Sequence, residues 1–179
     1  MQIKRMLGVA AMASLTVVPR AAAQAPPGVG EGWNGELDHA ARQITQLADA
    51  VPADKYSWRP AVGVRSMSEV IMHIAIANYF LAGQAAGTKP SVELSKLGKE
   101  PEKSLTAKDE VVKFLKGSFE DVRAAAKTAD RTRKLKLFGK EVTVDAVLLR
   151  TLVHNHEHMG QLIAYARMNG VTPPWSGGQ

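Results

Sequence analysis

The segment 144–168 constrains the fold more than any other part of the chain. Its inward-facing positions follow one another at intervals of four, three, four, three and four residues: Val147, Thr151, His154, His158, Gln161 and Tyr165. Residues spaced in this way share one face of an α-helix, because a helix has about 3.6 residues per turn. A face of this length predicts a helix whose inner side packs against other helices.

Three earlier segments show the same helical periodicity, at about 34–50, 66–87 and 107–129. Their apolar positions recur every three or four residues: Leu37, Ala41, Ile44 and Ala48; Met67, Val70, Ile74, Ala77 and Leu81; Val111, Leu115, Phe119, Val122 and Ala126. Ser66 and Glu69 fit a capping box at the start of the second helix. Thr106, followed by Asp109, predicts a side-chain cap on the third, and Gly170 predicts the end of the fourth.

The connecting segments complete a prediction of fold class. The polar stretch 88–104, with Pro90 and Pro101, predicts a long crossover connection, and alternating apolar residues around Gly139 indicate a small hairpin. Few aromatic and many Ala, Leu and Val residues favour helix packing over a β-sandwich. We therefore expect an all-α, up-down four-helix bundle, with Trp58 anchoring a loop and the Pro-Pro-Trp tail packing back onto the helices.

The N-terminal residues have the layout of a secretory signal peptide. Lys4 and Arg5 precede the apolar run 6–18, and the small residues 21–23 follow. The run is shorter than the roughly 20 residues of a membrane-spanning helix. We expect cleavage after Ala23 and export to the periplasm or the medium. A plain N-terminal tail and a retained anchor are the alternatives. The domains are then 1–23 leader, 24–32 flexible lead-in, 33–175 bundle and 176–179 tail.

Cysteine content and charge exclude several classes of protein. The chain has no cysteine, which excludes disulfides, thiolate metal sites and a cysteine nucleophile. The formal charge is +6, from 23 basic and 17 acidic residues. Without the three basic residues of the leader, 20 basic and 17 acidic residues leave +3. No basic stripe is interleaved with aromatic residues, so we expect no nucleic-acid partner. The densest basic run, 131–136, is expected to be a solvated loop.

His154 and His158 are candidate metal ligands. They lie four residues apart on the predicted inner face of the last helix, so both imidazoles point to one side, one turn apart. Such a pair can bind a single metal ion. The alternative is two core histidines whose nitrogens are satisfied by other hydrogen bonds or by water.

His73 is the candidate third ligand. It lies on the inner side of the second predicted helix, between Val70 and Ala77, and no capping role explains it. A lone histidine on an apolar face is more often a hydrogen-bonded core residue. Together with the pair on the last helix, however, it would complete a three-histidine site. Three histidines that leave other coordination positions open are typical of catalytic rather than structural metal sites.

Other polar residues near these positions are weaker candidates for a role in the site. Gln161 lies on the same face and is expected to bond a ligand histidine or a metal-bound water, and a helix–helix hydrogen bond is the alternative. Glu157 and Tyr165 are weak candidates for a catalytic base, and a solvated carboxylate is the alternative for Glu157. His156 is expected to be exposed, and His39 lies off the inner face of its helix. The zinc-protease motif H-E-x-x-H is absent.

The stretch 154–161, with two histidines four apart followed by Gly-Gln, resembles the last-helix motif of the DinB/YfiT-like superfamily. The segments 56–60 and 65–66, the helix that carries His73, and the Pro-Pro-Trp tail are also similar to that family. Met159 departs from the pattern, since a basic residue is common there. The resemblance implies a four-helix bundle with a three-histidine site at His73, His154 and His158, zinc or nickel as the ion, and often a homodimer. It also implies, for some members, thiol-dependent transferase or isomerase activity.

These observations support three hypotheses of function. The first is a metal-dependent enzyme acting on an unidentified small molecule, in which the ion lowers the pKa of a coordinated water or thiol. For an exported protein, hydrolysis fits better than thiol transfer. The second is a non-catalytic module that binds a metal or a small ligand. The third is a structural bundle whose histidines bind nothing, so that replacing them changes only stability.

Overall fold

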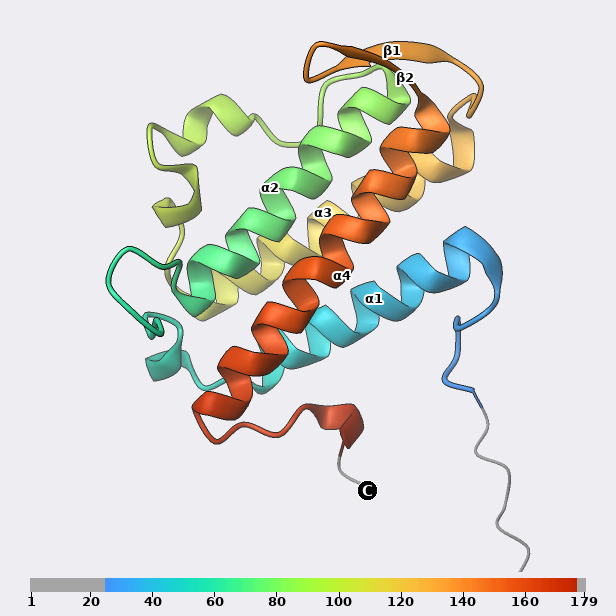
Figure 1. Ribbon diagram of the computed structural model, residues 1–179. Coiled ribbons are helices and arrows are strands. Elements are labelled where there is room, and N and C mark those ends of the chain that lie inside the picture. Colours follow the sequence, from blue (N-terminus) through green and yellow to red (C-terminus); the bar gives the residue numbers. More distant parts are fainter. Residues whose placement is uncertain (1–24, 177–179) are drawn as a thin grey trace, which may run out of the picture.

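The computed structural model describes residues 25–176, which form four long helices and one hairpin (Figure 1). The helices are α1 (Gly32–Ala50), α2 (Met67–Ala86), α3 (Lys108–Thr128) and α4 (Val144–Met168). The hairpin pairs β1 (Lys134–Leu137) with β2 (Lys140–Thr143) in antiparallel register. The expected all-helical bundle with a small hairpin is confirmed. The predicted leader, 1–23, and the last three residues of the tail lie outside the described residues.

The long crossover between α2 and α3 makes these two helices parallel. Arg65, just before α2, contacts Glu102, just before α3. At the other end, Arg133 follows α3 and donates to the carbonyls of Gln84 and Ala85 in the last turn of α2. The crossover runs outside the bundle and contains two short 3₁₀ turns, η2 (Leu94–Leu97) and η3 (Pro101–Lys103).

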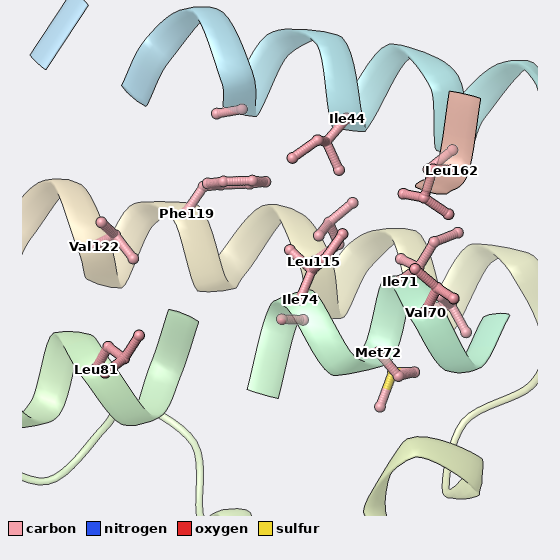
Figure 2. Packing of buried hydrophobic residues seen from close by; sticks show 14 of the residues in the cluster. Ile44, Val70, Ile71, Met72, Ile74, Leu81, Leu115, Phe119, Val122 and Leu162 are labelled. Atoms are coloured by element: carbon pink, nitrogen blue, oxygen red, sulfur yellow. The ribbon is translucent and has the colours of Figure 1, made fainter. Parts of the chain in front are cut away.

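α2 is the central helix of the bundle. It packs against α3 and against α4, which runs alongside it in the opposite direction (Figure 1). Apolar side chains from several helices meet in the core, among them Ile44 of α1, Ile71 of α2 and Leu115 of α3 (Figure 2). All three are at most 1 % exposed. This packing fixes the position of α2 relative to α4 and therefore of every side chain between them.

The predicted helix ends are partly confirmed. The Ser66 side chain accepts from the Glu69 amide, and the Glu69 carboxylate accepts from the Ser66 amide, so the capping box at α2 is present. The predicted Thr106 cap is wrong, because α3 begins after Ala107 and has no side-chain cap. Two acidic residues in the first turn of α3, Asp109 and Glu110, interact favourably with the helix dipole instead.

The basic run 131–136 is not the solvated loop that we expected. Arg131 lies over the ring of Trp33 at 5.3 Å and pairs with Asp145. Arg133 caps the end of α2, and residues from Lys134 onward form β1. Lys134 also pairs with Glu141 across the hairpin, so three charges of the run have defined partners. Sequence periodicity could not indicate the partners of Arg131 and Arg133.

The two predicted aromatic anchors contact the bundle. Trp58 meets the ring of Tyr165 edge-on at a centroid distance of 5.3 Å, and Trp175 packs against the hydrophobic core. Within residues 25–176, no helix is both long enough and apolar enough to cross a membrane.

Candidate metal centre

Three histidines meet between α2 and α4. His73 comes from α2, and His154 and His158 come from successive turns of α4. One ring nitrogen from each lies within 4.8 Å of the other two, and the ring centroids are 4.5 to 4.9 Å apart. The four-residue spacing aligns the two α4 rings, and the packing of α2 against α4 brings the third ring to them. The structure thus brings together all three residues proposed as ligands.

The separation of the nitrogens fits a shared metal ion. The Nε2 atoms of His73 and His154 are 3.1 Å apart. Two nitrogens bound to one tetrahedral zinc ion at its usual bond length lie about 3.3 Å apart. Three nitrogen donors without thiolate or carboxylate suit a transition-metal ion, because imidazole binds zinc, copper, iron and nickel.

His73 is oriented by a carboxylate from the crossover. Its Nδ1 lies 2.6 Å from Oε1 of Glu102, which assigns the proton to Nδ1 and leaves the Nε2 lone pair facing the cluster. Arg65 donates to both oxygens of the same carboxylate, at 2.6 and 2.9 Å. Burial tends to raise the pKa of Glu102, but the bonds from Arg65 and His73 outweigh it and lower that pKa, so the group stays ionised.

His158 is oriented by a neutral chain of hydrogen bonds within α4. Its Nδ1 donates to Oε1 of Gln161 at 2.9 Å, and Nε2 of Gln161 donates to the Tyr165 hydroxyl at 2.9 Å. The bond that we expected between Gln161 and a ligand histidine is therefore present. Because Nδ1 of His158 carries the proton, its Nε2 is free to bind an ion.

His154 has no such partner. Its Nδ1 is buried and makes no hydrogen bond, so its only polar contact is the one to His73. Burial, and then the neighbouring rings of His158 and His73, lowers the pKa of His154 to about 4. Burial also lowers the pKa of His73. Both rings are neutral at pH 7, which is the form that binds metals.

The weaker candidates lie away from this cluster. The Glu157 carboxylate is exposed and pairs with Arg150 at 3.1 Å, which lowers its pKa, as expected for a solvated group. Tyr165 reaches the site only through Gln161. His39 accepts from Arg42 on α1. The expectation that His156 is exposed is wrong, because its ring is half-buried and bonds the carbonyl of Leu152 within the same helix.

Sequence reasoning missed Glu102 and underrated Arg65. Glu102 lies 29 residues from His73 in an aperiodic segment, and no spacing rule connects them. Arg65 appeared only as part of a family resemblance. Both lie on the wall of a surface hollow of about 570 Å³, which Gln161 and Lys103 also line. The hollow therefore reaches the residues that orient two of the three histidines.

The sequence profile of the DinB superfamily matches residues 36–162, a span that includes all three histidines. No curated protein is significantly similar in sequence.

Several solved structures share the fold at low identity. A DinB-like protein from Bacillus cereus superposes with a TM-score of 0.63 at 17 % identity, covering 81 % of this chain and 95 % of its own. A DinB-like protein from Bacillus subtilis has a TM-score of 0.60 at 24 % identity, covering 76 % of this chain and 92 % of its own. A conserved protein from Enterococcus faecalis has a TM-score of 0.62 at 13 % identity, covering 78 % of this chain and 95 % of its own. At such identities the similarity concerns the fold alone.

Proposed function

The chain belongs to the DinB superfamily, and from this we propose that it binds a divalent metal ion, zinc or nickel, through His73, His154 and His158. The observation that carries the proposal is the convergence of three ring nitrogens within 4.8 Å. Two of the rings have their outer nitrogens bonded, to Glu102 and Gln161, so that their inner nitrogens are available to an ion.

We further propose that the metal-loaded protein is an enzyme of the hydrolase or thiol S-transferase type. A bound divalent ion supplies Lewis acidity, which lowers the pKa of a coordinated hydroxyl or thiol. Two observations support this proposal: His73 and His158 are only half-buried, and a surface hollow lies beside Glu102 and Gln161, the residues that bond their outer nitrogens. A non-catalytic binding module is the alternative.

Metal content tests the binding proposal. The mature protein, purified without a histidine tag, is compared by elemental mass spectrometry with a His154→Ala/His158→Ala variant. We expect near-stoichiometric zinc or nickel in the wild type and none in the variant. His156→Ala, which removes a histidine from the same helix but not from the cluster, is the matched control and should retain the ion. No metal in the wild type, even after incubation with zinc or nickel, would rule out the site.

The binding of a small thiol to the metal distinguishes an enzyme with open coordination positions from a non-catalytic module with a closed coordination sphere. In protein loaded with cobalt(II), the visible spectrum reports the coordination sphere. If coordination positions are open, addition of a small thiol should change the spectrum, and substrate screening then follows. An unchanged spectrum at millimolar thiol favours the non-catalytic module.

We also propose that the protein is exported. The basic start, the apolar run 6–18 and the alanines at 21–23 support this. Fractionation of the producing cells, followed by mass spectrometry of the N-terminal peptide, should find a mature form beginning at Gln24 outside the cytoplasm. An intact N-terminus in the cytoplasmic fraction contradicts the proposal.

A further inference from the structure

We infer that Glu102, held by Arg65, is a positioning residue for the metal site, and that it couples metal binding to the attachment of the crossover segment 88–107. This inference rests on the proposed metal function and deepens it. It concerns the one histidine of the cluster whose outer nitrogen faces a charged group.

The first step is the direction of the His73 ring. Its Nε2 faces His154 at 3.1 Å, and its Nδ1 faces Glu102 at 2.6 Å. The carboxylate therefore contacts the side of the ring that points away from the cluster. It acts on an ion through the imidazole, by fixing its tautomer and increasing its basicity, and not as a ligand itself.

The second step is the unequal support of the three rings. His73 bonds an ionised carboxylate, whereas His158 bonds a neutral amide and the outer nitrogen of His154 has no partner. A charge-assisted hydrogen bond is about twice as strong as a neutral one. His73 is therefore the ligand whose orientation and basicity depend most on its outer partner.

The third step is how Glu102 is held in place. No residue in the segment 88–107 is buried, and within it only the partly buried Leu105 packs against the hydrophobic core, so hydrophobic packing attaches the crossover weakly. Glu102, by contrast, is bonded by both Arg65, just before α2, and His73, within α2. The bidentate arginine fixes both carboxylate oxygens. The same contacts thus orient His73 and fasten η3 to α2.

Variants that remove the Glu102 charge test the inference. Glu102→Gln and Glu102→Ala are compared with Glu100→Gln, a matched control two residues away whose carboxylate is exposed and pairs with Lys103. Zinc affinity is measured by competition with a chromophoric chelator. We expect the Kd to rise about 10- to 100-fold in both Glu102 variants, and by less than twofold in the control. Unfolding of the metal-free proteins confirms that each variant is folded.

Hydrogen exchange provides a readout that a purely structural role would not change. Adding zinc to the wild type should slow amide exchange in residues 99–105, and this protection should be lost in Glu102→Gln. In the cobalt(II) protein, the visible spectrum of that variant should shift as well. A wild-type Kd in both Glu102 variants, or zinc-independent exchange in the crossover, overturns the inference while the metal site stands. A wild type that binds no zinc or nickel overturns the proposed function, and this inference with it.

Discussion

At the scale of single residues, a buried amide pair joins α2 to α4 beside the histidines. Asn155 donates to Asn78 at 2.8 Å, Asn78 donates back at 3.4 Å and also to Ser118 on α3, and all three side chains are fully buried. Asn155 directly follows His154, and Asn78 lies five residues after His73. The pair therefore sets the register of the two helices that carry the cluster.

Removing one asparagine should lower the free energy of unfolding by more than the hydrogen bonds themselves contribute, because its partner stays buried without them. Asn155→Ala removes the donor to Oδ1 of Asn78 and leaves that buried oxygen unsatisfied, so we expect a loss of about 2 kcal/mol in the free energy of unfolding. Asn78→Ala should behave similarly. The double variant should lose less than the sum of the two, because it removes both partners. Urea unfolding of the three variants measures the coupling, and strict additivity would show that the pair is not an energetic unit.

At the scale of secondary-structure elements, the start of α2 differs from that of α3. Ser66 caps α2 reciprocally with Glu69, which Arg59 also contacts at 2.9 Å, whereas α3 starts at an uncapped Ala107. Both helices are preceded by a hydroxyl residue in the sequence, but only one hydroxyl satisfies a free amide.

Matched alanine variants should reveal this difference. Ser66→Ala removes a cap and should lower the free energy of unfolding by about 1 kcal/mol. Thr106→Ala removes an exposed side chain with no capping bond and should change stability by less than about 0.5 kcal/mol. Chemical denaturation of both variants under the same conditions provides the comparison. Equal losses would mean that the structure assigns the wrong cap.

At the scale of the whole molecule, an ion at the cluster would join two helices that are distant in sequence. A ligand that binds only the folded chain raises its stability, by about 2.7 kcal/mol at a free concentration of 100 Kd. For a chain of this size, we expect chelation to lower the Tm by roughly 5 to 10 °C. Differential scanning calorimetry of the loaded and chelated protein measures the shift. The His154→Ala/His158→Ala variant should show none, and an equal shift there would place the stabilising ion elsewhere.

Much of the helical part of the site could be predicted from sequence because local spacing carries the information. His154, His158 and Gln161 share a helix, where intervals of three and four residues determine which side chains lie together. The capping box at Ser66 is likewise local. Thr106 shows the limit of such rules, because the same residue type before a helix forms no cap when the helix begins after Ala107.

The remaining features of the site depend on contacts between distant segments. His73 could be proposed as a ligand from its place on an apolar face, but only the packing of α2 against α4 brings its Nε2 to within 3.1 Å of His154. Arg133 similarly looked like part of a solvated run until the structure showed it at the end of α2.

By itself, the sequence determined the helical segments, the inward faces of α1, α3 and α4, and the three histidines, because apolar periodicity and ligand spacing are properties of the local backbone. It did not predict that α2, as the central helix, is buried on several sides. The tertiary structure alone decided that Glu102 bonds both Arg65 and His73, that His154 keeps an unpartnered buried nitrogen, and that Glu102 and Gln161 line one surface hollow. Glu102 lies on an aperiodic crossover, whose path is set by the helices that it connects and not by its own sequence.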